Sequence, residues 1–518
     1  MKKKIIRACT VSMSVGFVKG MLPDLTKKYE VVLLSSPGPE MDEAREQYGV
    51  RTIEVPMERH ISPVKDFLSL CRLIRVFLKE KPDMVHSMTP KAGLLCMTAA
   101  WLTRVPVRIH TFTGLVWPTS TGLKRRILML TDAITCWCAT HVIPEGEGVK
   151  ADLMNNGITR KPLRILGYGN VRGIDMQRFK KTTDDSDNTD IAHSEKTNTN
   201  FASKREQCQT RLSIAEREQS QDRDSGINCT NNTDMSHAEK LKTKNQKLKT
   251  KNSFEFLFVG RIVRDKGINE LVEAFCRLNS EKPETRLVLV GFYEQNLDPV
   301  SEETHRMIEE NPNIIMAGER TGDDLVRSYA EADCFVFPSY REGFPNTVLE
   351  AGAMGLPCIV TDINGSREII TDIAHADLAD HADSFKPRIA RIDTDDNIAH
   401  AEKQTNTNDT NNTNNFSHAD LADLADSLTT DDTNDFLSRR SRRSRRFDLN
   451  KKVKTKTNGI IIPPRDAEAL YEAMKMMVTD DGMREAMARN ARPMIESRFE
   501  QGFVRKCLYD FYEDILDS

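Results

Sequence analysis

The chain has 518 residues, with 74 Lys and Arg against 77 Asp and Glu, and a formal net charge of −3 at pH 7. A chain of this length is too long for one ordinary domain, so we expect two or three domains. The balanced charge gives no support for a nucleic-acid partner, and we expect none. The 11 cysteines include no C-x-x-C pair, which argues against a zinc motif and indicates reduced thiols packed in cores.

The N-terminal residues do not have the form of a targeting segment. Three lysines precede a short apolar run at residues 5–11, and no small-residue cleavage site follows it, so the run predicts a first strand rather than a signal peptide. No stretch approaches the roughly 20 apolar residues that span a bilayer, and residues 92–102, the best candidate, predict a buried helix. We therefore expect a cytoplasmic protein, and peripheral contact with the inner face of the plasma membrane remains open.

Residues 1–181 show the alternation of a first α/β domain. Strands are predicted at residues 4–11, 31–36, 51–55, 83–86, 107–112, 141–144 and 163–166, and helices between several of them, for example at 63–78 and 124–138. Strands that alternate with helices form parallel sheets through right-handed crossovers. The helix at 124–138 opens with Lys124, Arg125 and Arg126, which either rest on anionic lipid or form a solvated helix start.

Two segments interrupt this pattern with low-complexity sequence. Residues 182–252 and 373–457 are rich in Asn, Thr, Asp, Lys and Ser, and they have too few large apolar residues to offset the entropy of ordering. They also share text, since H-A-D-L-A-D at 375–380 recurs at 418–423. We predict two disordered inserts of common origin. The Arg-rich run at 439–446 is an anchor for anionic lipid or RNA, or a solvated tail, and the solvated tail is favoured because isolated basic runs are common.

The second α/β domain is predicted at residues 253–372 and 458–490. Strands are predicted at 254–259, 286–290, 313–316, 334–338, 358–361 and 459–462, and helices at 267–278, 303–310, 321–330, 347–353 and 467–477. Residues 484–516 form one amphipathic helical pattern, and residues 491–518 are assigned to a C-terminal helix. Two such domains leave a cleft between them, where ligands bind at the carboxyl ends of the strands.

The strongest chemical signal is the string F-P-S-Y-R-E-G-F-P-N-T-V-L-E-A at residues 337–351. A strand ends at Pro338, and Asn346 or Thr347 is predicted to cap a helix whose free N–H groups can hold a diphosphate. Glu342 on the loop can face a sugar, and Glu350 one turn into the helix can accept from ribose hydroxyls. Taken alone, the two glutamates would be a solvated loop residue and an acid that favours the helix dipole.

Two further loops follow predicted strands of the second domain. In the first, Gly260 ends a strand and Arg261 and Lys266 follow, where two cations can neutralise a leaving diphosphate or be ordinary exposed loop cations. In the second, the N–H groups of the turn at Gly365 and Ser366 can also approach phosphate.

In the first domain, His110 lies toward the carboxyl edge of the strand predicted at 107–112. It can contact a transferred sugar or be a satisfied structural residue, and the sequence favours neither. Glycines at 167–173 have the wrong spacing for a dinucleotide fingerprint, so no NAD site is expected.

These strings together resemble the family 4 retaining glycosyltransferases of the GT-B fold, and look closest to the bacterial branch that extends lipid-linked capsule, O-antigen or glycoprotein glycans. The most specific mark is the pair Glu342 and Glu350 with seven residues between them. The strings H-S-M-T-P-K-A-G at 86–93, R-I-H-T-F-T-G at 108–114 and G-R-I-V-R-D-K-G at 260–267 also match.

The resemblance implies a function and a role for each residue. Arg261 and Lys266, after Gly260, would hold the donor diphosphate, Glu342 the donor sugar and Glu350 the ribose. The phosphates would be bordered by Asn346, Thr347 and Val348, and His110 would contact the sugar from the opposite domain. The reaction that the resemblance implies is transfer from a nucleotide sugar, with UDP as the expected nucleotide, to a lipid-linked or polysaccharide acceptor, with retention and without metal or cofactor.

Two alternatives remain beside this expectation. One is a sugar-nucleotide epimerase on the same fold, although that group is not marked by the glutamate pair. The other is an inactive copy that binds nucleotide or partners only, because the second insert splits a loop that is short in the family and lies near the donor site.

Overall fold

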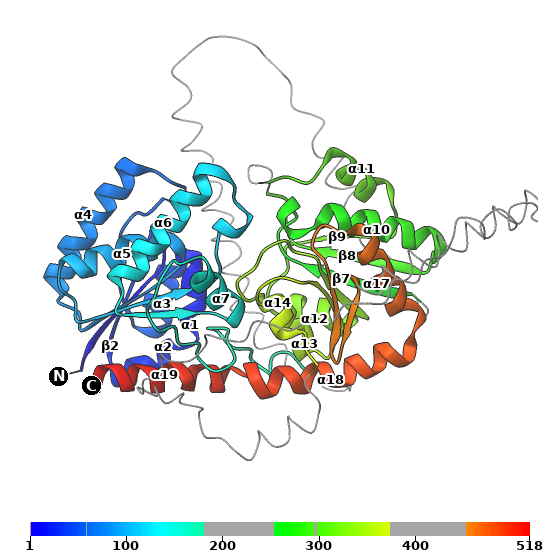
Figure 1. Ribbon diagram of the computed structural model, residues 1–518. Helices are drawn as coiled ribbons and strands as arrows, with labels where there is room; N and C mark the ends of the chain where they lie inside the picture. Colours follow the sequence, from blue (N-terminus) through cyan, green and yellow to red (C-terminus); the bar gives the residue numbers. More distant parts are fainter. Residues whose placement is uncertain (1, 59, 181–252, 295–297, 373–451, 518) are drawn as a thin grey trace, which may run out of the picture.

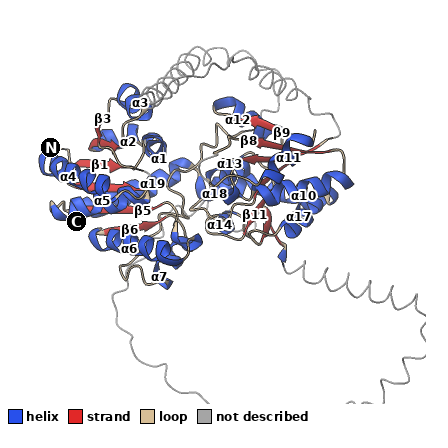
Figure 2. Ribbon diagram, turned by 90° about the horizontal axis from the view of Figure 1, so that it is seen from above, coloured by secondary structure: helices blue, strands red, loops and turns tan. Residues whose placement is uncertain are grey.

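The computed structural model describes residues 2–58, 60–180, 253–294, 298–372 and 452–517. Of the predicted inserts, residues 182–252 and 373–451 lie outside these ranges, and so does the Arg-rich run at 439–446. The described residues form two α/β domains, each with a parallel or mainly parallel sheet between layers of helices (Figures 1 and 2). The predicted pair of Rossmann-like domains is confirmed.

The first sheet has six parallel strands in the order β3-β2-β1-β4-β5-β6. Its strands are β1 (Lys4–Ala8), β2 (Glu30–Ser35), β3 (Arg51–Glu54), β4 (Met84–Met88), β5 (Val107–Phe112) and β6 (His141–Pro144). The helices that matter below are α4 (Pro63–Glu80), α5 (Pro90–Leu102), α6 (Gly122–Cys138) and α7 (Glu147–Asn155). Because the strand order reverses between β1 and β4, the carboxyl edge there opens toward a ligand site.

The predicted strand at residues 163–166 is wrong. Only one bridge, between Leu163 and Val142, joins this segment to the sheet. Pro162 precedes it and has no N–H to donate to a ladder, so pairing does not continue.

The second sheet has seven strands in the order β12-β13-β11-β10-β7-β8-β9. They are β7 (Phe254–Val259), β8 (Thr285–Val290), β9 (Ile314–Gly318), β10 (Cys334–Phe337), β11 (Cys358–Thr361), β12 (Lys454–Lys456) and β13 (Gly459–Ile462). The helical segments are η4 (Arg264–Lys266), α10 (Ile268–Glu281), α11 (Glu302–Glu310), α12 (Gly322–Glu331), α13 (Asn346–Ala353), α14 (Ser366–Ile369) and α17 (Ala467–Thr479).

Strand β12 lies within the range predicted to be disordered, and it pairs antiparallel with β13 at the sheet edge. The turn between them is fixed by Asn458, whose side chain donates to the carbonyl of Ile369 at 3.1 Å and accepts from the N–H of Thr371 at 3.0 Å. The N–H of Thr457 donates to the carbonyl of Thr371 at 3.1 Å. The two sides of the split loop are therefore joined beside the sheet, and the interruption does not open it.

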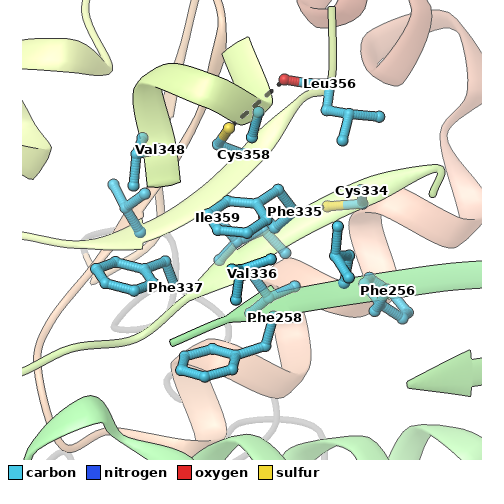
Figure 3. Packing of buried hydrophobic residues seen from close by; sticks show 14 of the residues in the cluster. Phe256, Phe258, Cys334, Phe335, Val336, Phe337, Val348, Leu356, Cys358 and Ile359 are labelled. Atoms are coloured by element: carbon cyan, nitrogen blue, oxygen red, sulfur yellow. Dashed lines mark hydrogen bonds between the residues drawn. The ribbon is translucent and has the colours of Figure 1, made fainter. Parts of the chain in front are cut away.

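The core of the second domain is aromatic where β7 and β10 lie side by side (Figure 3). Phe258 and Phe337 stack with ring centroids 5.8 Å apart, and Phe335 and Phe256 are fully buried. Large buried rings provide much of the stabilisation of such a core. They also hold the end of β10 rigidly, and the loop with Glu342 begins there.

The predicted single C-terminal helix is two helices, α18 (Asp481–Phe499) and α19 (Gln501–Asp517). Glu500 between them is not helical, with ψ of 136°, because the chain pairs there with Ile174, which donates to the carbonyl of Phe499 and accepts from the N–H of Gln501. Helix α18 packs on the second domain and α19 returns to the first, where Tyr512 joins its core (Figure 1).

Candidate active site

The loop after β10 brings two of the predicted site residues together. Lys266 forms an ion pair with Oε1 of Glu342, and Ser339 Oγ donates to the same oxygen at 2.7 Å. The side chains of Lys266 and Glu342 are only 14% and 16% exposed. The carboxylate of Glu342 is therefore fixed by Lys266 and Ser339, and Glu342 is not a solvated loop residue.

A glycine makes this arrangement possible. Gly267 ends η4 with φ of +70°, and a Cβ there would lie 2.1 Å from the carbonyl oxygen of Pro338. The N–H of Tyr340 donates to the carbonyl of Asp265 at 2.9 Å, which joins the same two loops a second time. This backbone contact places Lys266, the residue before Gly267, beside the loop of Glu342.

Arg261 lies at the same sheet edge but has another partner. It forms an ion pair with Glu294, which follows β8, and its side chain is 32% exposed. Gly260 precedes it and is fixed by its N–H bond to the carbonyl of Val290 at 2.9 Å. To meet a diphosphate, Arg261 would exchange this carboxylate for the phosphate.

Helix α13 begins at Asn346, with Pro345 as its N-cap and no capping bond from a side chain. The prediction that Asn346 or Thr347 caps the helix is wrong, because Asn346 already has helical geometry and its Oδ1 accepts from Nδ2 of Asn170 at 3.1 Å. With no side-chain cap, the first N–H groups of α13, which include that of Thr347, remain suited to an anion. Val348, in the same turn, is fully buried.

Glu350 is buried inside the domain and is not an exposed acid of the first turn. One of its oxygens accepts from the hydroxyl of Tyr329 at 3.0 Å. Burial is the main cause that raises the pKa of Glu350, and the neighbouring Arg172 opposes it. A ribose hydroxyl would have to donate to a position of this carboxyl group that Tyr329 does not occupy.

Gly365 packs against the donor loop, since a Cβ at its φ of +74° would lie 2.2 Å from the carbonyl oxygen of Gly343. Its N–H is taken by Oε1 of Glu368 at 3.2 Å. Glu368 also accepts from the N–H groups of Glu147 at 2.7 Å and Gly148 at 3.0 Å, at the start of α7 in the other domain. The turn at Gly365 is thus a contact between the domains (α14 and α7 in Figure 1).

His110 has the surroundings of a structural residue. It is buried, its Nδ1 lies 2.8 Å from Ser87 Oγ, and its ring stands edge-on to Phe112 with centroids 4.4 Å apart. A Cβ on Gly93 would lie 2.4 Å from the ring. Burial lowers the pKa of His110 to about 3, so it is neutral at ordinary pH.

The two domains meet backbone to backbone beside Glu342. A Cβ on Gly343 would lie 2.2 Å from the carbonyl oxygen of Thr113, and one on Gly114 would lie 3.1 Å from Cα of Gly343. The loop after β5 and the loop after β10 therefore touch, which places the carboxylate of Glu342 at the junction of the domains.

Sequence reasoning missed Glu145, which directly follows β6 at this junction and is only 3% exposed. Burial raises its pKa to about 8, the N–H of Val171 donates to its carboxyl group and opposes that rise, and Glu368 and Glu342 add to it. The available signal was an acid placed directly after an apolar strand, at the edge where ligands bind in such folds.

Among the residues that the structure describes, no group of three or more His, Cys, Asp or Glu is arranged to hold a metal ion. Within the same ranges, none of the helices has the length and apolarity that crossing a membrane requires.

Comparison with known proteins agrees with this architecture. Residues 239–409 match the family model described as glycosyl transferases group 1, and residues 25–169 match the glycosyl transferase 4-like domain. The chain is 30% identical over 373 residues to the capsular polysaccharide biosynthesis glycosyltransferase CapM of Staphylococcus aureus, covering 71% of this chain and 82% of that protein. It is 27% identical over 359 residues to an Escherichia coli UDP-Gal:alpha-D-GlcNAc-diphosphoundecaprenol alpha-1,3-galactosyltransferase, covering 67% of this chain and 76% of that protein.

Solved structures support the fold. Anabaena Alr3699/HepE in complex with UDP superposes with a TM-score of 0.57 at 13% identity, covering 99% of this chain and 100% of that one. Sucrose-phosphate synthase of Thermosynechococcus elongatus superposes with a TM-score of 0.58 at 14% identity, covering 99% of this chain and 100% of that one. The two sheets and the sequence relationship lead to the same assignment. The chain belongs to the family 4 glycosyltransferases, enzymes of the GT-B fold.

Proposed function

We propose that this glycosyltransferase transfers a sugar from a UDP-sugar to a lipid-linked acceptor at a membrane surface, with retention of the anomeric configuration and without a metal. The observation that carries the proposal is the ion pair of Lys266 with Glu342, placed where the backbones of the two domains meet. The named relatives support the donor and the acceptor, since one acts on a diphosphoundecaprenol-linked sugar and a structural neighbour binds UDP.

The chemistry follows from charge. When the sugar leaves, negative charge develops on the diphosphate, and stabilising that charge is the main catalytic requirement. Lys266 and Arg261 supply two cations at the carboxyl edge of β7, and the start of α13 adds uncapped N–H groups. In this proposal these groups balance the diphosphate without a metal ion.

Glu342 acts on the sugar side. Ser339 and Lys266 fix its carboxylate, so the carboxylate can accept hydrogen bonds from sugar hydroxyl groups without first being ordered. His110 would act by its shape and not by proton transfer. As a neutral, buried imidazole it would shape the first-domain wall of the sugar site rather than carry a proton.

The test is calorimetric binding of UDP, GDP and ADP to the full chain. We expect UDP alone to bind, and Lys266→Met to weaken binding by about tenfold or more, because a charge-assisted bond contributes about 1.5–3 kcal/mol. Arg264→Met is the matched control, because Arg264 lies in the same η4 segment but is 63% exposed and pairs with Asp298. Turnover of UDP-hexoses and UDP-N-acetylhexosamines with an undecaprenyl-diphosphate sugar then tests the transfer.

If none of the three nucleotides binds the folded protein, the donor site is absent and the inactive-copy alternative replaces this proposal. If UDP binds equally well to wild type and to Lys266→Met, the nucleotide lies elsewhere.

A further inference from the structure

Among the residues that the structure describes, Arg7 is a buried cation that has no carboxylate partner. It lies on β1 and is only 2% exposed. Its Nη1 donates to Nδ1 of His86 at 3.0 Å and to the hydroxyl of Tyr512, and its Nη2 donates to Sδ of Met88 at 3.1 Å. All three acceptors are neutral atoms. Buried charges in proteins are normally paired, because removing an unpaired charge from water is costly.

Arg7 belongs to the face of the first sheet that α19 covers. It pairs in register with His86 of β4, and Met88 of β4 pairs with Thr111 of β5, so these four side chains leave the sheet on one side. Helix α19 runs along this side and contributes Tyr512 (Figure 1). Helices α4, α5 and α6 pack together over the opposite face. The charge of Arg7 is therefore enclosed between the sheet and α19.

The titratable groups around Arg7 do not supply a negative charge. Within the described ranges, the groups on which its charge acts are Cys9, His86, Tyr509 and Tyr512. Burial raises the pKa of Cys9 and that of Tyr509 to about 12, and it also raises the pKa of Tyr512. Burial lowers the pKa of His86 well below its ordinary 6.5. All four groups are uncharged at neutral pH, so the protein leaves the charge of Arg7 uncompensated.

A small cavity lies beside this cation. Its polar wall is formed by Arg7, His86, Met88, Thr111 and Asn170, and the rest of its wall is apolar and includes side chains of α19. The cavity has room for about one molecule of the size of water. The Nε atom of Arg7 is buried and has no hydrogen-bond partner within the part of the chain that the structure describes. One donor of the cation is therefore left over at the cavity.

The acceptors of His86 and Thr111 are already engaged. Arginine can only donate, so Nδ1 of His86 is the acceptor in its bond with Arg7. The neutral imidazole then carries its hydrogen on Nε2, which donates to Oγ1 of Thr111 at 2.7 Å. The hydroxyl hydrogen of Thr111 remains to be donated.

Asn170 contributes a donor in the same way. Its Oδ1 accepts from the N–H groups of Arg172 at 3.0 Å and Gly173 at 2.7 Å. One hydrogen of its amide group is donated to Oδ1 of Asn346 at 3.1 Å, and the second hydrogen has no such use. The wall of the cavity therefore has hydrogens to donate, while its side-chain acceptors are taken.

We infer that this cavity binds a small monovalent anion such as chloride, which pairs with Arg7 beneath α19. A halide ion accepts hydrogen bonds and donates none, so it matches a wall with spare donors, one of them on a cation. A water molecule would need acceptors for its own hydrogens, and it would leave the charge of Arg7 unpaired. The size of the cavity excludes phosphate and sulfate. The inference does not rest on the proposed function.

The test is thermal unfolding of the full chain in sodium chloride, sodium bromide or sodium gluconate at equal ionic strength. Tryptophan fluorescence reports on the correct domain, because all three tryptophans lie in the first domain. A ligand at 100 times its Kd raises the Tm by about 5–10 °C in a domain of this size. We expect such a rise in chloride and in bromide relative to gluconate, which is too large for the cavity.

Arg7→Met should lose this response to chloride, because it removes the cation and the spare donor. The matched control is Arg164→Met. Arg164 also contacts α19, but its side chain is 45% exposed and pairs with Asp514 at 3.4 Å. The control should keep the full response to chloride, which separates the site from general effects of salt on the fold.

An equal chloride response in wild type and Arg7→Met would overturn the inference, and so would a wild type whose Tm is the same in chloride and in gluconate. If Arg7→Met does not fold, crystals of the wild-type chain grown in sodium bromide decide the question. An anomalous bromide peak beside Nε of Arg7 would support the site. A cavity that holds only water under these conditions would refute it.

Discussion

The buried carboxyl group of Glu145 should make the first domain less stable as the pH rises. Burial raises the pKa of Glu145 from its ordinary 4.5 to about 8, so the folded state keeps a proton that the unfolded chain has already released. The stabilisation is complete below the ordinary pKa and is lost as the pH rises toward the raised one, by about 1.4 kcal/mol per pH unit. From about pH 6.5 to about pH 8 the loss amounts to about 2 kcal/mol.

Between about pH 6.5 and about pH 8, the effect of Glu145 on stability can be told apart from that of the buried histidines. Burial lowers the pKa values of His110 and His86, so their contributions change below their ordinary value of 6.5 and are flat above it. Asp132 has the same sign as Glu145, because burial raises its pKa to about 7, and it adds about 0.7 kcal/mol over the interval. Wild type should therefore lose about 3 kcal/mol and Glu145→Gln less than about 1 kcal/mol, since the amide still accepts from the N–H of Val171.

Tryptophan fluorescence during urea unfolding isolates the relevant domain. The three tryptophans of the chain, Trp101, Trp117 and Trp137, all lie in the first domain. The free energy of unfolding of wild type, Glu145→Gln and the control Asp132→Asn should be measured at several values across the interval. Parallel pH dependence of wild type and Glu145→Gln would refute the reasoning, and a larger effect of Asp132→Asn would transfer the titration to that residue.

Three further predictions concern the cleft. Glu342→Gln should lower kcat by about 100-fold or more while the Kd for UDP changes little, because the lost charge acts on the sugar side; equal losses in both would place Glu342 at the nucleotide instead. Gly267→Ala should destabilise the chain by about 2 kcal/mol or more in thermal unfolding, because φ is +70° there and the new Cβ would lie 2.1 Å from a carbonyl oxygen. Gly482→Ala is the control and should be nearly neutral, because the atom nearest to its Cβ would be 3.7 Å away. Glu368→Ala should raise the radius of gyration in small-angle scattering, because three N–H groups lose their shared acceptor at the domain junction; an unchanged radius would show that closure does not need it.

The sequence supported the fold well, because each sheet is built from apolar runs that alternate with helical patterns. It failed at points fixed by distant residues. The pairing of Glu500 with Ile174 breaks the last helix although the amphipathic pattern continues through it. Strand β12 forms because β13 offers it an edge, although its own Lys-Thr-Lys sequence has no apolar residue.

The site divides in the same way. The loop with Glu342 and the loop with Lys266 could be placed at one sheet edge, because both directly follow strands. Partners from elsewhere in the chain could not be predicted. Glu294 forms an ion pair with Arg261, 33 residues away in the chain, and the hydroxyl of Tyr329 donates to Glu350, 21 residues away.

Three acidic residues lie close together at the junction between the domains, and each is stabilised in a different way. Glu342 is neutralised by the cation of Lys266, Glu368 is held by N–H groups from both domains, and Glu145 keeps a proton. A donor diphosphate would add further negative charge to this junction, and that charge raises the cost of ionising Glu145 still more. Donor binding and the proton on Glu145 should therefore support each other, so UDP affinity should fall as the pH rises above about 8 and should fall less in Glu145→Gln.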